Sequence, residues 1–334
     1  CPKVERLLLV PESHSRNLFY FESLNRLYNI LTQAGFEVKI ASLDPALTSA
    51  KLIELANGEQ LKLEPAHKRG NRLAVGDFSP CCIVLNNDLS AGVPPQLANI
   101  EQNIMPAIAL GWSTRLKSEH FRFYAAVCED FAKAFAIDPW LISPLFAQCP
   151  TINFQQAAGQ ECLVSHASDL LTQIRHKYQQ YEIKEKPFLV VKADQGTYGM
   201  AVMMIDSAEQ LLKLNRKQRN KMSRSKGGSD VTKVIIQEGV HSFETVGAEK
   251  AVAEPVIYTI GRHAIGGFYR IHRGRGPREN LNAPGMNFQP MPIAPKCHLT
   301  TQSCASPFYI YGIVARLALL AAAKELAALK QEIG

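Results

Sequence analysis

The segment from Lys186 to Ile205, KPFLVVKADQGTYGMAVMMI, constrains the fold of this chain more than any other stretch. Two apolar runs flank a short polar turn, and this pattern predicts a β-hairpin. Gly196 and Gly199 allow the turn to take positive φ and to approach a bound group closely. Because the first run ends at Lys192, an ammonium group stands beside a turn whose backbone N–H groups could cradle a phosphate.

The hairpin has two interpretations. A Walker A loop and a dinucleotide fingerprint both lead from their glycines into a helix, whereas this turn leads into a second strand. One interpretation is therefore a flexible glycine hairpin that folds over a nucleotide, with Lys192 directed at the phosphates and Thr197 offering a hydrogen bond. The other is an ordinary hairpin whose lysine reaches solvent along its apolar stem.

The composition limits the classes of protein to consider. With 334 residues, 46% of them hydrophobic and 20% charged, the chain is long enough for two or three globular domains. Its net charge of +7 favours an anionic partner, such as a nucleoside triphosphate, an acidic metabolite or nucleic acid. We expect no membrane span and no signal peptide, because no apolar run is long enough. Eight cysteines without a CxxC pair fit reduced thiols in a cytoplasm better than a disulfide framework or a zinc site.

The N-terminal region has the pattern of a βαβ unit. Strands are predicted over 7–10 and 36–41, with a helix over 18–33 between them. The loop after the first strand lies at the carboxyl end of a parallel strand, where open α/β sheets bind their ligands. Ser13, Arg16 and Asn17 are therefore candidates for substrate binding, although Ser15 or Asn17 could instead cap the helix.

Two further strands, over 81–85 and 104–110, are expected to extend this sheet. The second leads into a polar loop that contains Arg115 and Lys117 and ends at a long helix over 121–135. Two cations just before a helix predict an anion-binding site, in which Arg115 would contact substrate. A solvent-exposed basic turn is the alternative.

The pattern of predicted helices and strands changes near the middle of the chain, and we place a domain boundary between 1–145 and 146–334. In the second domain, helices are predicted over 161–181, 207–214 and 306–333, the last as a core helix packed on a sheet. The basic run 215–228 ends in Gly-Gly, and we expect 215–230 to be a mobile loop. Nucleic-acid binding is the alternative for this run, although aromatic residues are not interleaved with its cations.

Three more strands, over 234–240, 254–261 and 264–271, are followed by a glycine-rich loop over 273–285. Arginines, glutamates and asparagines gather in these segments. Hard oxygen ligands beside fixed positive charge are what a magnesium–triphosphate site needs. A solvated loop built from turn residues is the alternative interpretation.

The order of these motifs resembles the ATP-grasp fold of bacterial glutathione synthetases: Lys117, then Lys192 with GTYGM, then QEGV, EPVIY, GGFYR and GPRENLNAPG. More closely, the phrases VVKADQGTYGMAV, GGFYRIHRGRGPRENLNAPGMNF and YIYGIVARLALLAAA resemble the proteobacterial glutamate-cysteine ligase family. The resemblance covers nearly the whole chain. It implies an α/β protein with an N-terminal parallel α/β domain for the substrate and an ATP-grasp domain that resembles glutathione synthetase.

The resemblance also implies a reaction, in which ATP drives the joining of the γ-carboxylate of glutamate to the amine of cysteine through an acyl phosphate. Glutathione synthesis would begin with this step, and the cofactors would be ATP and Mg²⁺. The residues that would contact ATP are Lys117, Lys192, Gly196, Thr197, Tyr198, Gly199, Gln237, Glu238 and Val240. Arg270 and Arg273 would be catalytic, because they would neutralise the transferred phosphoryl group or the substrate carboxylate.

The metal ligands implied by the resemblance are Glu279, Asn280, Asn282 and Glu254. ATP-grasp enzymes usually use a carboxylate and a Glu-x-Asn pair on a late strand. Here the nearest match, Glu-Asn-Leu-Asn, is spaced one residue differently and lies in a glycine-rich loop.

Two alternatives to this function remain open at the level of sequence. A related carboxylate–amine ligase, such as a glutathione synthetase, would share the ATP-binding half and differ in the loops after the N-terminal strands. A nucleic-acid-binding protein would use the run from Arg216 to Lys226 and would lose affinity steeply as salt rises. We expect glutamate and cysteine as partners, neither nucleic acid nor membrane, a cytoplasmic location, and leave a homo-oligomer open.

Overall fold

The computed structural model describes residues 4–12, 17–89, 92–111, 115–156, 159–196, 201–224, 230–291 and 307–333. Contacts divide the chain into two compact units, Cys1–Arg115 and Leu116–Gly334. Helix α2 (Lys117–Phe135) lies between this division and the domain boundary predicted at 145/146, and it packs against α5 (Pro307–Ile333) of the second unit. The boundary at 145/146 stays a prediction.

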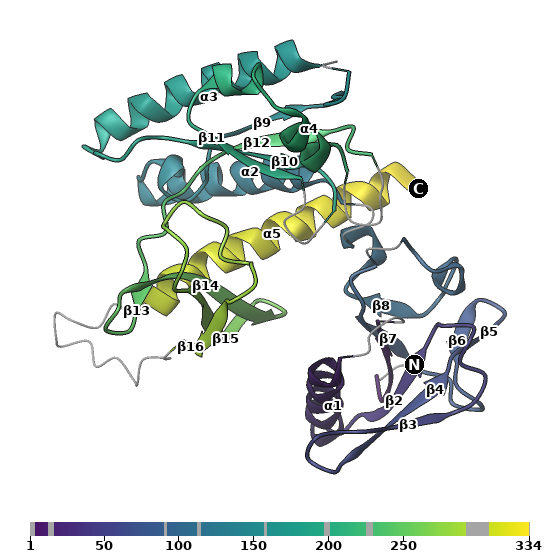
Figure 1. The fold of residues 1–334 in the computed structure, drawn as a ribbon. Helices are drawn as coiled ribbons and strands as arrows, with labels where there is room; N and C mark the ends of the chain where they lie inside the picture. The colour runs from purple at the N-terminus through teal and green to yellow at the C-terminus, as the bar shows by residue number, and fades with distance from the viewer. Residues whose placement is uncertain are drawn as a thin grey trace. The chain divides into compact units, whose positions relative to one another are not determined.

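The first unit is built on a six-stranded sheet in the order β3-β4-β2-β1-β7-β8 (Figure 1). The predicted βαβ unit is present, because β1 and β2 pair in parallel and α1 connects them. Strands β7 and β8 extend the sheet in parallel, while β3 and β4 form an antiparallel hairpin. The elements of this unit are β1 (Arg6–Pro11), α1 (Leu18–Gln33), β2 (Glu37–Ser42), β3 (Lys51–Glu54), β4 (Gln60–Pro65), β5 (His67–Arg69), β6 (Arg72–Ala74), β7 (Cys82–Asn86), η1 (Pro95–Leu97), β8 (Asn103–Met105) and η2 (Ile108–Leu110).

The central strand β1 is buried on both faces. Leu7 and Leu9 belong to the hydrophobic cluster beneath α1, whereas Leu8 and Val10 belong to a second cluster on the opposite face. Alternate side chains of a strand point to opposite faces, so four consecutive apolar residues predict a strand covered on both sides. This pattern is why the sequence located the strand correctly.

The fourth predicted strand, over 104–110, is largely wrong. Strand β8 covers only three residues, and η2 occupies the end of the predicted range. Pro106 follows β8 directly and has no N–H to donate to the ladder. An apolar run with an internal proline was therefore too long to be one strand.

The first sheet of the second unit is antiparallel, in the order β11-β10-β12-β9 (Figure 1). The hairpin predicted from the sequence is confirmed, since β10 and β11 pair directly across the glycine-bearing turn. Helix α3 packs on one face and α2 contacts β9. The elements are β9 (Phe146–Cys149), α3 (Gln160–Gln180), β10 (Leu189–Ala193), β11 (Val202–Ile205) and β12 (Val234–Glu238), with the 3-10 helix η3 (Pro139–Leu141) before them.

A second antiparallel sheet follows, in the order β13-β14-β15-β16. Its long central strands pair from Val252 with His272 to Ile260 with His263. Helix α5 contacts β14, β15 and α2, which confirms the C-terminal helix packed on a sheet. The strands are β13 (Thr245–Val246), β14 (Ala251–Ile260), β15 (His263–His272) and β16 (Asn287–Pro290).

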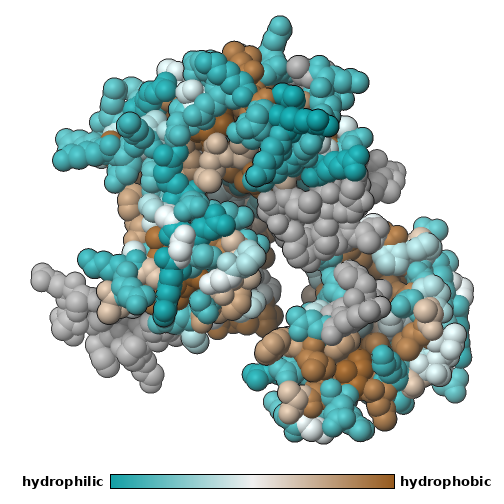
Figure 2. Space-filling view, in the orientation of Figure 1, coloured by the Kyte–Doolittle hydropathy of each residue, from teal (hydrophilic) through white to brown (hydrophobic). Residues whose placement is uncertain are grey.

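The mobile loop predicted over 215–230 is wrong for its first half. Residues Arg216–Ser223 form helix α4, while 225–229 lie outside the described residues. Asn215 begins this helix with a capping box, in which its side chain and that of Gln218 each accept the other residue's backbone N–H. Met222 is buried beneath it, and Figure 2 shows hydrophilic side chains over α3 and α4. The helix predicted over 207–214 is a short 3-10 helix, η4 (Ala208–Leu211).

The described cysteines are mostly free thiols. Cys82, Cys128, Cys149 and Cys162 are unbridged, and burial raises the pKa of the Cys82 and Cys128 thiols. Cys81 is disulfide-bonded, so the prediction of reduced thiols is wrong there. Cys81 and Cys82 are neighbours at the start of β7, so their side chains point to opposite faces of the sheet. The composition of the chain does not distinguish these two environments. Among the described residues, no helix is both long and apolar enough to cross a membrane.

Candidate active site

Two lysines predicted to bind ATP meet at the end of β10. Lys192 lies on this strand and donates to Gln237 Oε1 of β12 at 2.6 Å. Gln237 pairs with Val190, two residues before Lys192, so the two side chains are diagonal neighbours on one face of the sheet. Burial lowers the pKa of Lys192. A neutral amide thus fixes this ammonium group without neutralising it.

Lys117 approaches the same strand end from α2. Its ammonium donates to the backbone carbonyls of Ala193 at 2.8 Å, Asp194 at 3.3 Å and Gly196 at 2.9 Å. Burial lowers the pKa of Lys117 to about 8, with the nearby charge of Asp194 opposing the shift and that of Lys192 adding to it. The prediction placed Lys117 before the helix, whereas it is the first residue of α2.

Asp194 holds the start of α2 against the hairpin, and no sequence motif marks this residue. Its fully buried carboxylate accepts from the Ser118 backbone N–H at 2.8 Å, Ser118 Oγ at 2.7 Å and Gln148 Nε2 at 2.9 Å. Leu116, at the N-cap position, has no capping side chain of its own. Asp194 therefore caps α2 from a distant segment, and this explains why the helix begins four residues earlier than predicted.

The predicted adenine-binding segment, Gln237 to Val240, has a mixed environment. Glu238 is buried, and its carboxylate accepts from Trp140 Nε1 at 2.9 Å and the Leu145 N–H at 3.0 Å. This carboxylate therefore supports the fold, and burial raises its pKa. Gly239 lies so close to the ring of Phe188 that a Cβ would stand 2.2 Å from it. Val240 is exposed and is the member of the segment that a base could contact.

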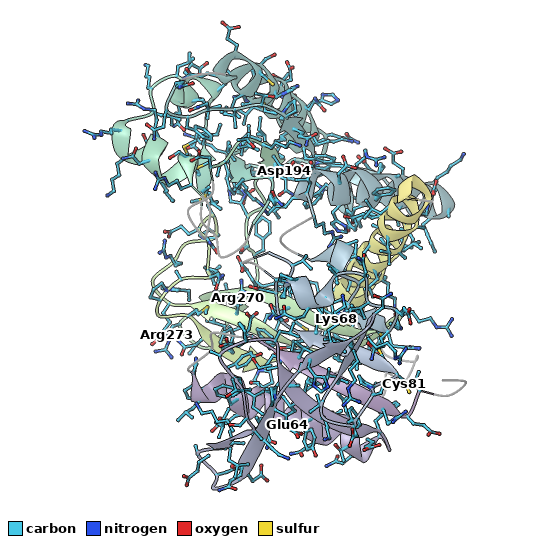
Figure 3. All side chains as sticks on the ribbon, turned by 90° about the vertical axis from the view of Figure 1, so that its right-hand side faces the viewer. Glu64, Lys68, Cys81, Asp194, Arg270 and Arg273 are labelled. Atoms are coloured by element: carbon cyan, nitrogen blue, oxygen red, sulfur yellow. The ribbon has the colours of Figure 1, made fainter. Side chains whose placement is uncertain are left out.

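A second group of predicted residues lies on the other sheet of the unit (Figure 3). Arg270 of β15 stands opposite Glu254 of β14, with 3.5 Å between Nη1 and Oε2. Glu254 also accepts the backbone N–H of Leu281, so it touches the loop that carries the predicted asparagine ligands. Burial raises the pKa of Glu254, and the charge of Arg270 opposes the shift. The Arg270 Nε atom is buried without a hydrogen-bond partner among the described residues.

The remaining members of this group are more exposed. Arg273 pairs with Glu249 at 3.6 Å, and both side chains are over 70% exposed. Glu279 accepts from the Gly276 N–H at 2.7 Å and Arg275 at 2.9 Å, and these contacts lower its pKa. Its carboxylate is thus already engaged within the loop.

The predicted asparagine ligands share that loop, where Asn280 Oδ1 accepts the N–H of Asn282 at 2.9 Å. Of the N-terminal substrate candidates, Asn17 caps α1 by accepting from the Phe19 N–H at 3.0 Å, the alternative left open by the sequence. Arg115 ends the first unit. The other candidates lie outside the described residues: Ser13, Arg16, Thr197, Tyr198 and Gly199.

The fold is that of the ATP-grasp class. The VanG D-Ala:D-Ser ligase from Enterococcus faecalis superposes with a TM-score of 0.50 over 96% of this chain and 83% of its own, at 8% identity, and shows the likeness of fold alone. A family model for GshA, glutamate-cysteine ligase, matches residues 1–326. The chain belongs to this glutamate-cysteine ligase family.

A solved structure supports the assignment. The crystal structure of a proposed γ-glutamylcysteine synthetase from Methylobacillus flagellatus is 46% identical, with a TM-score of 0.87 over 98% of this chain and 78% of its own. No curated protein matches the chain. The activity of the chain is therefore ATP-dependent glutamate–cysteine ligation, which forms γ-glutamylcysteine for glutathione.

Proposed function

We propose that Lys117 and Lys192 hold the phosphates of ATP while the γ-carboxylate of glutamate attacks the terminal phosphoryl group. The observation that carries this proposal is their convergence at the end of β10, where neutral carbonyl and amide oxygens hold both ammonium groups. Neither lysine forms an ion pair with another described residue. A triphosphate could therefore approach both lysines without breaking an ion pair among the described residues.

The chain's own residues support the following steps. The glutamate carboxylate forms a bond to the γ-phosphorus of ATP, and the bond to the leaving ADP oxygen breaks. The cysteine amine then attacks the acyl carbon, loses a proton and displaces phosphate. Positioning and electrostatics carry most of such catalysis, so no side-chain nucleophile is required. We assign Arg270 to the developing phosphoryl or carboxylate charge, with Arg273 as a second candidate.

The residues near Glu254 fit a magnesium ion. Mg²⁺ prefers hard oxygen ligands and usually takes one or two carboxylates together with substrate phosphates and water. Glu254, Asn280 and Asn282 offer such oxygens on adjoining segments. The arginine contact of Glu254, 3.5 Å from Arg270, is longer than that of Glu279, 2.9 Å from Arg275. We propose Glu254 as the principal ligand. When bound, the ion would offset the negative charge that develops on the transferred phosphoryl group.

ADP release by the purified protein with magnesium and ATP tests this function. We expect release that requires glutamate and cysteine together. Release with γ-glutamylcysteine and glycine would instead assign the glutathione synthetase step. Lack of release in both mixtures would contradict catalysis by the chain, while leaving the fold untouched.

We propose a cytoplasmic site of action, because four described cysteines are free thiols, although Cys81 is disulfide-bonded. Fractionation of cells that express the tagged chain tests this location. A homo-oligomer stays a prediction, and light scattering of the purified protein measures it.

A further inference from the structure

Two cysteines and a histidine meet beneath α3, away from the lysines of the active site. Cys149 ends β9, and Cys162 and His166 lie four residues apart on α3, which places them on one face of the helix. The two Sγ atoms are 3.0 Å apart, and His166 Nδ1 is 3.5 Å from each of them. Among the described residues, this is the one group of three or more potential ligands whose atoms all lie within 4.8 Å.

We propose that Cys149, Cys162 and His166 bind a zinc ion. Zinc bonds of about 2.3 Å to sulfur and 2.0–2.1 Å to nitrogen place tetrahedral S–N pairs about 3.6 Å apart. The observed separations of 3.5 Å match this geometry. Two sulfurs on one ion would stand about 3.8 Å apart, so the thiols need to spread by less than 1 Å.

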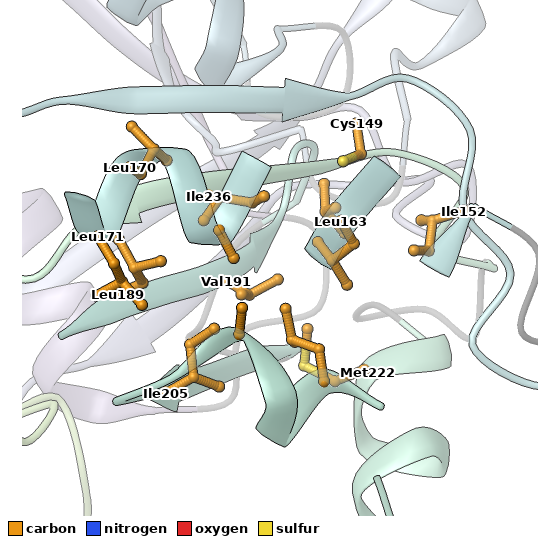
Figure 4. Close-up of a cluster of buried hydrophobic side chains, with 14 of the residues drawn as sticks. Cys149, Ile152, Leu163, Leu170, Leu171, Leu189, Val191, Ile205, Met222 and Ile236 are labelled. Carbon is orange, nitrogen blue, oxygen red and sulfur yellow. The ribbon is translucent and has the colours of Figure 1, made fainter. Parts of the chain in front are cut away.

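The chemistry of the cluster selects the class of metal. Thiolates and imidazole favour zinc or similar soft cations, whereas magnesium and calcium take oxygen ligands. A Zn²⁺ ion with two thiolates and a neutral imidazole carries no net charge, which suits a site in the hydrophobic core. Figure 4 shows Cys149 beside Leu163 of α3 within this core.

The cluster has a partly open side, through which an ion could enter and a fourth ligand could bind. Cys149 is fully buried, but Cys162 and His166 are half-buried and line the more open side. Zinc binds cysteine as the thiolate, so each thiol loses its proton on coordination. Binding of one Zn²⁺ would release two thiol protons, and a water molecule would complete the coordination.

A zinc ion at this site would link α3 to β9, next to a residue that supports the active site. Gln148 precedes Cys149 on β9 and donates to Asp194 from the opposite face of the sheet. A metal bridge would therefore hold the strand that orients Asp194. The expected effect of the ion is to hold α3 on β9, and the readouts below do not depend on catalysis.

Cobalt titration of the chelator-treated, reduced full-length protein tests the proposal. Co²⁺ is added with excess Mg²⁺ present to occupy oxygen-ligand sites, and thiolate-to-cobalt charge-transfer absorption is recorded. We expect saturation at one equivalent, displacement by one equivalent of Zn²⁺, and a higher melting temperature with Zn²⁺. Cys162→Ser should abolish the absorption and the thermal shift, and His166→Gln should weaken Co²⁺ binding at least tenfold.

Two controls separate zinc binding at this cluster from metal binding by thiols elsewhere in the chain and from loss of the fold. Cys128→Ser removes another buried free thiol, outside the cluster, and should leave the cobalt spectrum unchanged. Cys162 and His166 are half-buried, so their variants are expected to fold even where a Cys149 variant fails; circular dichroism checks this. Absent charge-transfer absorption, equal binding by folded Cys162→Ser, or a persistent Cys149–Cys162 disulfide in the reduced protein would each overturn the proposal.

Discussion

The two four-stranded sheets of the second unit hold their cationic side chains in different ways. On the β11-β10-β12-β9 sheet, Lys117 and Lys192 donate to neutral carbonyl and amide oxygens. On the other sheet, Arg270 faces Glu254, and in the turns beside that sheet Arg273 faces Glu249. In the first arrangement a phosphate would meet ammonium groups held by neutral oxygens, with the Asp194 carboxylate near Lys117, whereas the second offers an anion site and a cation site side by side.

The two sheets also differ in how deeply their strands are buried. All five residues of β12 are buried, while most residues of β14 and β15 are half-buried or exposed. Charges fixed in a packed core need little reorganisation when a ligand arrives, and low local polarity strengthens their fields. The comparison therefore predicts that substitutions on the first sheet cost more activity than those on the second.

The largest effect is expected for Lys192→Ala. Removal of a positioned charge that contacts a transferring phosphoryl group should lower kcat/KM by about 10²–10³-fold. Steady-state ADP release measures the change, and circular dichroism should report an intact fold. Lys233→Ala, which removes an exposed lysine just before β12, is the matched control and should retain activity. Wild-type turnover by Lys192→Ala would contradict the proposal that Lys192 binds the phosphates of ATP.

Asp194→Ala should mainly affect stability. The substitution leaves the N–H and hydroxyl of Ser118 and the amide of Gln148 without their acceptor inside the protein. Buried groups left unsatisfied cost about 1–3 kcal/mol each, and partial relaxation should limit the total loss to about 3 kcal/mol. Urea denaturation measures this. Asp169→Ala, an exposed site on α3, should change stability by less than about 0.5 kcal/mol; equal losses would contradict the capping role.

Arg270→Ala should lower kcat/KM by roughly 10–100-fold, less than Lys192→Ala, because Glu254 already offsets part of its charge. Arg270→Lys should recover only part of the activity, since an ammonium group lacks the planar fork of guanidinium. The same ADP assay measures both variants. A loss larger than that of Lys192→Ala would reverse the comparison between the two sheets.

Much of this fold could be predicted because local apolar patterns determine it. The hairpin of β10 and β11, the βαβ unit, α3 and α5 all have periodic apolar residues bounded by turn signals. The start of α2 could not be predicted, since its capping carboxylate comes from Asp194, 76 residues away from Ser118. The helix at the start of the basic run could have been predicted, because its capping box is formed by residues close together in the sequence.

The candidate functional residues also fall into those with a local sequence signal and those that only packing brings together. Lysine at a strand end beside glycines is a local signal, and it led to Lys192. In the cluster of Cys149, Cys162 and His166, only the two helix residues share a local spacing. Cys149 comes from a strand that tertiary packing brings to the helix. The lack of a CxxC pair in the sequence therefore could not exclude it.

The pH dependence of ATP binding should report Lys117. Below about pH 8 its ammonium is charged before ATP binds, so affinity should vary little with pH. Above that pKa the free protein loses the proton, and ATP binding must restore it. Affinity should then fall by up to about tenfold per pH unit. Calorimetric titration in buffers of different ionisation enthalpy measures this uptake, and Lys117→Arg should flatten the profile. A flat wild-type profile from pH 7 to 9.5 would contradict the assignment.

The smallest effect is expected for Arg273→Ala. Its side chain is 76% exposed and pairs with that of Glu249, which is 72% exposed, and such ion pairs contribute about 0–1 kcal/mol. Water and salt already screen this charge, so kcat/KM should change by less than about threefold. Activity measured beside Arg270→Ala, at low and high salt, gives the comparison directly. If Arg273→Ala instead matched Arg270→Ala at both salt concentrations, the exposed arginine would act on the reacting groups themselves. Burial would then be a poor guide to which cations of this sheet serve catalysis.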